Sequence, residues 1–194
     1  MLGDLGINYQ LNEGDGAFYG PKIDFHIKDA IGRSHQCATI QLDFQMPEKF
    51  NLSYVDEKNE KVRPVVIHRA IFGSIDRFFG ILIEHFAGAF PIWLAPIQVQ
   101  IIPVSSVHLD YALEVQSVLK NAGIRVEIDE RIEKLGYKIR ASQIQKVPYT
   151  LILGDNEAQE GTVNIRKLGC RETNNLSIKD FMISIQQKVD QRVL

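Results

Sequence analysis

An arginine in an apolar segment is the clearest candidate in this sequence for a residue that binds an anion. Gly73 and Ser74 open a predicted helix that is apolar on almost every side from residue 75 to residue 86, which predicts a buried helix. Arg77 lies one turn inside that helix, and a buried guanidinium needs an anionic partner because it cannot be neutralised. A nearby carboxylate is the commoner partner. A phosphate is the alternative, since the free N–H groups and the positive dipole of a helix start attract anions.

Three positions further upstream in the sequence carry polar groups that have two interpretations each. Tyr19 and Lys22 flank a Gly-Pro turn, which delivers an aromatic ring and a cation just before a strand. Lys22 is either a ligand contact or an ordinary solvated surface residue. His68 lies at the end of an apolar strand, where a lone histidine is more often a core residue than a zinc ligand, because zinc takes three or four protein ligands.

A polar stripe follows the predicted strand around residues 36–41. Alternation places Gln36 on one face of this strand, together with Ala38 and Ile40. Cys37, Thr39 and Gln41 fall on the other face. Amides and hydroxyls on a sheet face suit either a small polar ligand or solvent, and the pattern leaves both open.

The elements that would position these groups divide near Pro91–Pro96. Before it, alternating or β-branched runs predict strands at 23–27, 38–44 and 63–69, which form an antiparallel sheet. After it, strands at 97–104, 124–128, 149–153 and 162–166 alternate with a helix at 107–122, a basic helical segment and a last helix capped at Ser177. The sequence therefore predicts an α+β part, residues 1–95, and a compact α/β domain with a mixed sheet, residues 96–194.

Composition and charge exclude several classes of protein. The 194 residues are 45% hydrophobic and 24% charged, with a formal net charge of −2, which argues against wholesale disorder and against RNA binding by bulk charge. One local basic segment, residues 131–146, is either an RNA contact or a solvated helix face. No apolar run of membrane-spanning length and no secretory signal stands out, and the two cysteines are far apart. We therefore expect a soluble, cytoplasmic chain without membrane attachment.

Three motifs together resemble threonyl-tRNA synthetase. They are Tyr19-Gly-Pro-Lys-Ile-Asp, Gln36-Cys-Ala-Thr-Ile-Gln-Leu-Asp-Phe and His68-Arg-Ala-Ile-Phe-Gly-Ser-Ile-Asp-Arg-Phe, and Trp93-Leu-Ala-Pro and Gly154-Asp-Asn-Glu follow in the same order. The resemblance runs from about residue 13 to the C-terminus, and the stretch from His68 to Arg77 is the most specific. It implies the last part of a class II synthetase core, followed by an anticodon-binding domain.

The resemblance assigns roles position by position. It implies catalytic roles for Arg77 and Lys22 on ATP, which binds with Mg²⁺, and an ATP or adenylate site made of Lys22, Gln36, Gly73, Ser74 and Arg77. It implies a threonine pocket made of Tyr19, Cys37 and Gln41. His68 would be one of three ligands of a zinc ion that grips threonine, which would allow rejection of isosteric valine.

The second domain receives RNA-binding roles in the same way. Glu157 and Arg166 resemble residues that read anticodon bases of threonine tRNA. Ile132 stands where the family usually has a polar asparagine, so the details of base reading differ here. The prolyl, histidyl and glycyl enzymes share such a domain, but the His68 position and the Gln-Cys-Ala-Thr run favour the threonyl type.

The function implied is part of a threonine–tRNA ligase, an aminoacyl-tRNA ligase that is a homodimer as a whole protein. The alternative is a catalytically inactive tRNA-binding fragment or paralogue. The family's first two motifs, the other two zinc ligands and the editing domain have no counterpart in the sequence. We therefore expect the isolated chain to be metal-free and unable to make threonyl-adenylate, while residues from about 97 onward fold on their own.

Overall fold

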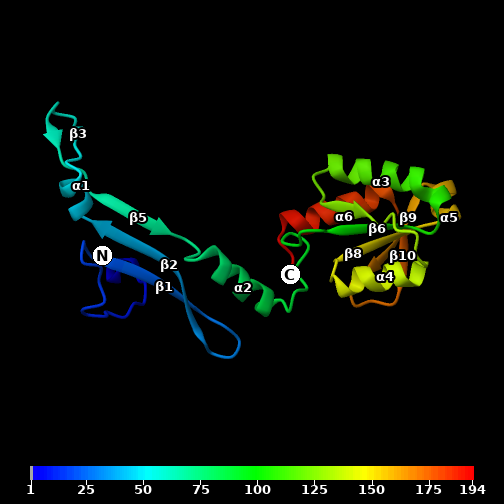
Figure 1. Cartoon of the computed structure of the whole chain (residues 1–194), viewed down its shortest axis with the longest axis horizontal. Helices are drawn as coiled ribbons and strands as arrows, with labels where there is room; N and C mark the ends of the chain where they lie inside the picture. Colours follow the sequence, from blue (N-terminus) through cyan, green and yellow to red (C-terminus); the bar gives the residue numbers. More distant parts are fainter. Residues whose placement is uncertain (1) are drawn as a thin grey trace. The chain divides into compact units, whose positions relative to one another are not determined.

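The computed structural model describes residues 2–194, and the chain divides into two compact units. The first unit ends at Ile81 and the second begins at Leu82. Each unit is described by itself below, with the elements labelled as in Figure 1.

A three-stranded antiparallel sheet forms the first unit. Its strands are β1 (Lys22–Lys28), β2 (Ser34–Asp43) and β5 (Val66–Ala70), in the order β1-β2-β5 (Figure 1). The three strands lie where alternation predicts them, although β2 begins four residues earlier than predicted. The antiparallel sheet expected for this part of the chain is therefore confirmed.

Short elements surround this sheet, and the sequence pattern did not predict them. They are the 3₁₀ turn η1 (Gly3–Leu5), the helix α1 (Gln45–Lys49) and the two-stranded hairpin of β3 (Tyr54–Val55) and β4 (Lys61–Val62). Asp56 closes the hairpin, because its carboxylate accepts the backbone N–H groups of Lys58 and Glu60 at 2.9 Å. Such side-chain turns carry no apolar period, so alternation cannot reveal them.

The predicted burial of the helix that holds Arg77 is wrong for this chain. Helix α2 (Ile75–His85) forms as expected, but none of its residues is buried, and Ile75 is 75% exposed. An apolar pattern on all sides predicts burial only where other elements supply a surface to cover it. Within residues 2–194, no element covers this helix on all sides.

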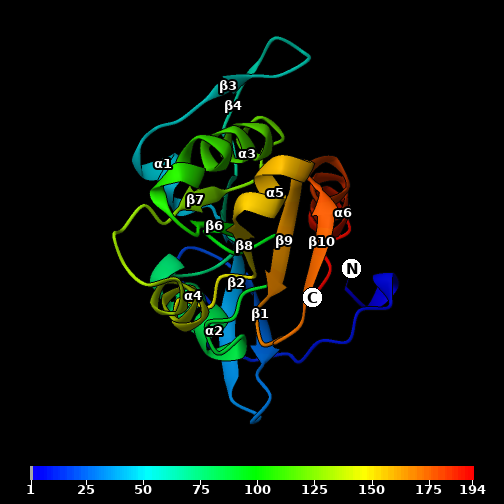
Figure 2. The same ribbon diagram turned by 90° about the vertical axis from the view of Figure 1, so that its right-hand side faces the viewer.

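The second unit is built on a five-stranded mixed sheet with the strand order β10-β9-β8-β6-β7. Strands β7 (Val126–Ile128) and β8 (Tyr149–Leu153) run parallel to β6 (Val99–Pro103), while β9 (Thr162–Lys167) and β10 (Thr173–Ser177) extend it as an antiparallel pair (Figure 2). The unit's helical elements are η2 (Ser106–His108), α3 (Leu109–Asn121), α4 (Leu135–Ile144), α5 (Asp155–Glu160) and α6 (Ile178–Asp190). The predicted mixed sheet is confirmed, whereas α5 and β10 were not predicted.

The two faces of this sheet differ in chemistry. Helices α3 and α6 pack on one face, where Val99, Ile101, Leu151, Leu119 and Ile185 form the centre of a continuous apolar core and are all fully buried. Helix α4 lies on the opposite side of the sheet from α3 (Figure 1). A buried hydrogen bond of 2.8 Å between Ser142 on α4 and Thr150 on β8 marks that side as more polar.

The predicted helices of the second unit can be compared with the observed ones. The helix predicted at 107–122 is α3, whose buried face consists of Ala112, Val115 and Leu119. The predicted cap of α6 is confirmed, since the Oγ atom of Ser177 accepts the backbone N–H of Asp180 at 3.1 Å. Caps of this kind hold a helix start by satisfying one of its free donors.

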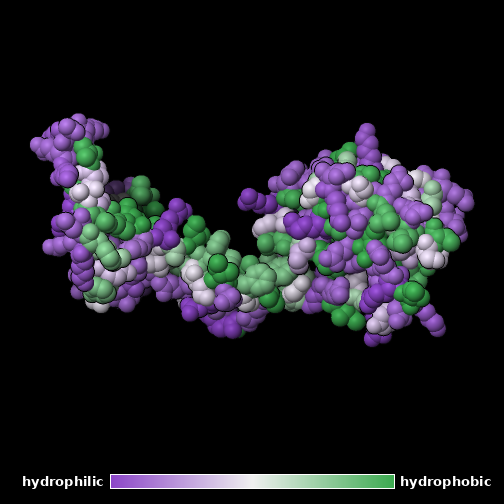
Figure 3. All heavy atoms as spheres, turned by 45° about the horizontal axis from the view of Figure 1, so that its top comes forward, coloured by the Kyte–Doolittle hydropathy of each residue, from purple (hydrophilic) through white to green (hydrophobic). Residues whose placement is uncertain are grey.

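The surfaces of the two units also differ. In residues 2–81, Cys37, Asp43 and Pro47 are the only buried residues, and hydrophobic surface is visible on this unit in Figure 3. Exposed apolar side chains include Phe25, Ile67 and Ile75. Among residues 2–194, no helix combines the length and the apolar character needed to cross a membrane.

Candidate functional site

A β-bulge decides which side chains gather on the polar face of the first sheet. The register between β1 and β2 runs regularly from Lys22↔Gln41 to Phe25↔Ala38, but the next pair is His26↔Gln36, so Cys37 is left over. A single extra residue shifts the alternation of the strand beyond it. Gln36 therefore joins the face of Thr39 and Gln41, and the predicted placement of Gln36 on the opposite face is wrong.

The carboxylate of Asp24 joins the polar groups on this face. Its Oδ1 atom accepts hydrogen bonds from Gln36 Nε2 and from Thr39 Oγ1, both at 2.7 Å. Its Oδ2 atom lies 2.9 Å from Lys22 Nζ. Burial by itself would raise the pKa of Asp24, but the hydrogen bonds from Thr39, Lys22 and Gln36 outweigh burial and lower it.

The pKa of Lys22 is shifted in the opposite direction to that of Asp24. Its hydrogen bond to Asp24, aided by the charges of Asp24 and Asp15, raises the pKa of the Lys22 ammonium against the opposing effect of desolvation. The Nζ atom lies 3.6 Å from the Asp15 carboxylate. The ammonium is thus a fixed positive charge at the start of β1, beside the turn that carries Tyr19.

That turn is pressed onto β2. A side chain at Gly20 would overlap the carbonyl oxygen of Leu42, and the backbone of the turn bonds to β2 through Leu42 N–H to Pro21 O at 3.0 Å. The close approach brings Tyr19 over the sheet, where its hydroxyl donates to Gln41 Oε1 at 2.7 Å. The structure therefore brings together Tyr19 and Gln41, which the resemblance to threonyl-tRNA synthetase assigned to one pocket.

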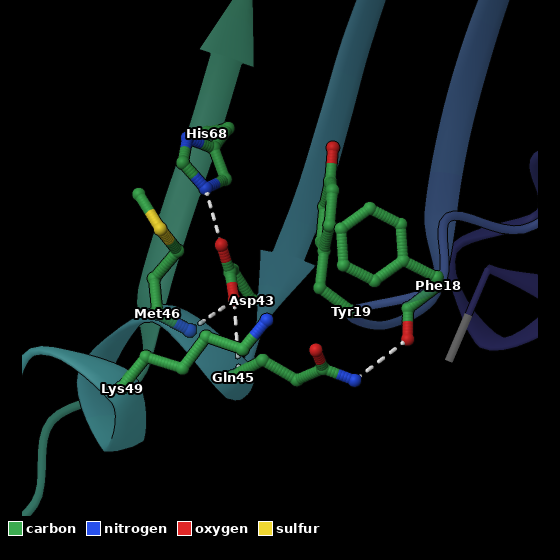
Figure 4. A pocket seen from close by; sticks show the side chains of 7 residues that line it. All are labelled: Phe18, Tyr19, Asp43, Gln45, Met46, Lys49 and His68. Carbon is green, nitrogen blue, oxygen red and sulfur yellow. Dashed lines mark hydrogen bonds and ion pairs between the residues drawn. The ribbon is translucent and has the colours of Figure 1, made fainter.

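His68 joins this pair from the neighbouring strand. It is the cross-strand partner of Gln41, and its ring lies 5.8 Å from the ring of Tyr19. Tyr19, His68, Asp43 and Lys49 are among the residues that line a pocket of about 180 Å³ beside α1 (Figure 4). The lining includes the rings of Phe18, Tyr19 and His68, and its most buried charged group is the Asp43 carboxylate.

Asp43 holds His68 in place. The carboxylate is 1% exposed, accepts the backbone N–H groups of Gln45 and Met46 at 2.9 Å, and lies 2.8 Å from His68 Nε2 (Figure 4). Burial would raise the pKa of Asp43, but the N–H of Met46, the His68 ring and the N–H of Gln45 lower it instead. An ionised carboxylate only accepts, so His68 Nε2 donates the proton of this hydrogen bond.

Cys37 contributes its backbone to the site. Its carbonyl oxygen faces Gly73, where φ is +63° and an added Cβ would lie 2.9 Å from that oxygen. A residue other than glycine at position 73 would be strained by both effects. The side chain of Cys37 is buried. The contact brings the segment before α2 onto β2.

Ser74 and Arg77 form the start of α2. The Arg77 backbone N–H lies 3.5 Å from Ser74 Oγ, and the Arg77 side chain is exposed. The structure therefore connects Gly73 to the polar face through Cys37, whereas Arg77 extends into solvent. Among residues 2–194, no group of three or more His, Cys, Asp or Glu side chains is arranged to hold a metal ion.

The predicted RNA-reading residues of the second unit lie at different ends of β8. Glu157 sits in the first turn of α5, just after β8, and its Oε2 atom accepts the Gly154 N–H at 2.9 Å. Arg166 pairs with Thr150 near the beginning of β8. The Gln143 amide, with its oxygen turned toward the guanidinium, accepts from Arg166 Nε at 3.2 Å. Arg166 also lines a surface hollow with Gly169, Cys170 and Arg171.

The basic segment 131–146 is less available than its composition suggests. Arg131 is bound to the Asp129 carboxylate at 2.6 Å, and Lys138 is buried with its ammonium 2.9 Å from the Asp129 carbonyl oxygen. The Lys146 ammonium binds the carbonyl oxygen of Ala87. Three of the five cations thus have internal partners. Ile132, at the position of the family's usual asparagine, is fully exposed.

Sequence reasoning missed several polar residues that organise these sites. Asp24 stands two residues after Lys22, and Asp43 stands two residues after Gln41, so strand spacing could have placed each on the same face as its neighbour. In the second unit, buried His108 joins the loop after β6 to α5, with Nε2 2.9 Å from Asp155 Oδ1. No local spacing signals that contact, because 47 residues separate the two.

Comparison with known proteins agrees with this geometry. Residues 1–86 match the model of the tRNA synthetase class II core domain (G, H, P, S and T), and residues 98–188 match that of the anticodon binding domain. Over 192 residues the chain is 69% identical to threonine–tRNA ligase 2 of Bacillus subtilis, and over 193 residues 57% identical to threonine–tRNA ligase of Clostridium tetani. These matches cover 99% and 100% of the chain but 30% of each relative, so the chain spans about a third of their length.

Two solved structures are similar to this chain in fold. The RNA binding domain of threonyl-tRNA synthetase from Cryptosporidium parvum matches with a TM-score of 0.80 at 39% identity, over 96% of this chain and 47% of that one. Prolyl-tRNA synthetase from the same organism matches with a TM-score of 0.66 at 23% identity, over 92% and 39%, which shows a shared fold. The resemblance expected from the motifs is thereby confirmed: the chain is related to threonyl-tRNA synthetases, as a class II core segment followed by an anticodon-binding domain.

Proposed function

We propose that this chain supplies the C-terminal part of a threonine–tRNA ligase, in which the first unit helps to activate threonine with ATP and the second reads the anticodon of threonine tRNA. The observation that carries the proposal is the polar face of the first sheet. Lys22 and Gln36 meet there at one carboxylate, and Tyr19 contacts both Gln41 and His68. By resemblance, these are the adenylate and threonine residues respectively.

In the proposed adenylate site, Lys22, Gly73, Ser74 and Arg77 have separate roles. The Lys22 ammonium is a fixed cation for phosphate or carboxylate oxygens, and Gly73 allows a ligand-binding backbone to approach β2 closely. Arg77, with its side chain in solvent at the start of α2, is available to hold the phosphates of ATP, bound with Mg²⁺, as negative charge shifts during transfer. Ser74 begins the same helix and lies under the nucleotide in this proposal.

The proposed threonine pocket rests on Tyr19, Cys37, Gln41 and His68. The Tyr19 hydroxyl occupies the Gln41 oxygen, so the Gln41 amide presents its N–H groups to the ligand. His68 is the one zinc ligand that we assign to this chain, through Nδ1, the ring nitrogen that is not bonded to Asp43. When bound, zinc supplies a Lewis acid that can hold a substrate hydroxyl and so separate threonine from valine.

We assign anticodon reading to Glu157 and Arg166 and place the boundary between the two functional domains near residue 95. The gap between the two matched family models, residues 87–97, supports that boundary. A cytoplasmic location, a homodimer and the absence of membrane attachment belong to the same proposal for the whole protein. The self-contained core of the second unit also supports the alternative, in which the chain by itself binds tRNA without catalysis.

A graft tests the proposal. Residues 1–194 replace the corresponding part of the Bacillus subtilis threonine–tRNA ligase 2, giving a protein called here the grafted enzyme. It should catalyse threonine-dependent exchange of pyrophosphate into ATP and charge threonine tRNA, while the isolated chain should bind the tRNA and do neither. A folded grafted enzyme without exchange activity would contradict the proposal. An isolated chain that does not bind threonine tRNA would contradict the role of the second unit.

A further inference from the structure

One carboxylate in the first unit touches two residues of the proposed adenylate site and is not itself one of them. Asp24 lies between Lys22, at the start of its own strand, and Gln36, on the far side of the bulge in β2. Its side chain is 15% exposed and receives three hydrogen bonds or ion pairs. We propose that Asp24 is the positioning residue that sets the direction of Gln36 and the place of Lys22 for adenylate formation, an inference that rests on the proposed function.

The direction of each hydrogen bond in this cluster follows from the charge of Asp24. An ionised carboxylate only accepts, so the Thr39 hydroxyl donates its proton to Asp24 Oδ1 at 2.7 Å. The Thr39 oxygen is then left to accept, and it does so from Gln36 Nε2 at 3.1 Å. The second N–H of the Gln36 amide is used by Asp24 itself at 2.7 Å.

Both N–H groups of Gln36 are therefore occupied, and its Oε1 atom remains as the group that can meet a ligand. Gln36 accordingly accepts a hydrogen bond from a hydroxyl or amino group of the adenylate and does not donate one to a phosphate. Gln41 has the reverse polarity, because the Tyr19 hydroxyl occupies its oxygen. The two glutamines on one sheet face thus present an acceptor and a donor, and Asp24 fixes the first of them.

Lys22 is the other group that Asp24 holds. A lysine side chain loses substantial rotamer freedom when it is fixed, so a partner that holds it before the ligand arrives lowers the cost of binding. The 2.9 Å ion pair with Asp24 uses one of the three ammonium protons, and the Asp15 carboxylate at 3.6 Å adds negative charge beside the ammonium without a hydrogen bond. The remaining protons stay available for an anionic oxygen of the substrate.

The test is Asp24→Asn in the grafted enzyme, measured by threonine-dependent exchange of pyrophosphate into ATP. The substitution keeps the shape but removes the charge, and an amide can turn its own N–H groups toward Gln36. We expect kcat/KM for ATP to fall about 10- to 100-fold, the range for losing hydrogen bonds to a charged group. Thr39→Val, which removes only the bridging hydroxyl, should give a smaller loss in the same parameter.

A double-mutant cycle separates positioning from a general loss of structure. If Asp24 acts through Lys22 and Gln36, Asp24→Asn should add little once Lys22→Ala and Gln36→Ala are both present. Asp29→Asn is the matched control, since Asp29 is equally exposed at 15%, lies on the same hairpin and binds Arg33 and His35 instead. It should leave exchange activity within about twofold of the starting grafted enzyme, the spread expected for a surface substitution.

The outcomes keep this inference apart from the proposed function. An active grafted enzyme whose exchange activity is unchanged by Asp24→Asn would overturn the role of Asp24 and leave the proposed function standing. Full additivity with Lys22→Ala and Gln36→Ala would also overturn it, because a positioning residue acts through its partners. An inactive but folded grafted enzyme would overturn the proposed function itself, and the role of Asp24 with it. Thermal unfolding of each variant identifies losses that come from folding alone.

Discussion

The two units of this chain bury their apolar residues very differently, although both contain strands and helices with apolar residues. The second unit packs α3 and α6 against its sheet and fully buries Ile101, Leu119 and Leu151. The first unit leaves Ile67 and Ile75 exposed. Its order comes from hydrogen bonds along three strands and from polar clusters. The second unit thus contains both layers of its own core. The first unit carries the candidate site residues on a sheet that has little core of its own.

The sharpest way to test the chemical side of this comparison is to remove Arg77. Arg77→Ala in the grafted enzyme should lower threonine-dependent pyrophosphate exchange by several orders of magnitude, because a cation that meets developing phosphate charge stabilises the transition state by several kcal/mol. Affinity for tRNA should stay nearly unchanged. Arg63→Ala is the control, since Arg63 on the same unit lies 3.9 Å from the exposed Glu48. Exchange at the starting rate in the Arg77 variant would exclude a phosphate role.

The same comparison predicts different costs for one substitution made in both units. Ile101→Ala should lower the free energy of unfolding of the second unit by about 2 to 5 kcal/mol, since Ile101 is fully buried and leaves a cavity. Ile75→Ala should change stability by no more than about 0.5 kcal/mol, because Ile75 is 75% exposed. Urea unfolding followed by circular dichroism and by the fluorescence of Trp93 measures both. Equal costs would contradict the difference drawn here.

Strand positions in both units were predictable from alternation, but the details of the site were not. Period-two alternation placed β1, β2 and β5 correctly, yet it put Gln36 on the wrong face, because one unpaired residue, Cys37, reverses the alternation beyond it. Nothing in the local sequence marks that bulge. The predicted burial of α2 failed for another reason: periodicity reports which residues are apolar and cannot report whether a covering surface is present.

Resemblance and geometry contributed different parts of the candidate site. The motifs predicted Tyr19, Gln41 and His68 as one group, and the structure places them within hydrogen-bond or ring contact. Asp24 and Asp43, which hold those groups in place, became visible only through their contacts. In the second unit, the ammonium groups of Lys138 and Lys146 bind backbone carbonyl oxygens, and composition alone had left that segment open as a basic surface.

A third prediction concerns the second unit, where RNA reading should be separable from activation. Arg166→Ala and Glu157→Ala in the grafted enzyme should each reduce discrimination between threonine tRNA and anticodon variants by about 10- to 100-fold, the effect of losing a hydrogen bond to a charged group. Pyrophosphate exchange should be unaffected. Glu157→Gln is a useful companion, because its amide oxygen can still accept the Gly154 N–H and preserve the start of α5. Unchanged discrimination in both alanine variants would remove these residues from base reading.

The smallest expected effect is a difference in acid stability between the units. Asp24, Asp29 and Asp43 of the first unit have pKa values lowered by their hydrogen-bond partners below the ordinary value of 3.8, against the opposing effect of burial. In the second unit, hydrogen bonds from Arg131 lower the pKa of Asp129 in the same way.

A carboxyl group whose pKa is lower in the folded state binds fewer protons there than in the unfolded state, so its contribution is complete above about pH 4 and is lost as the pH falls further. Three such groups and little core should make the first unit unfold at a higher pH than the second, by a margin kept small by solvent screening. Amide NMR spectra of the 194-residue chain, recorded from pH 6 down to pH 2, would follow both units at once. Asp29→Asn should flatten the pH dependence of the first unit and leave the second unchanged. Simultaneous loss of both sets of signals would show that the two units do not differ in this respect.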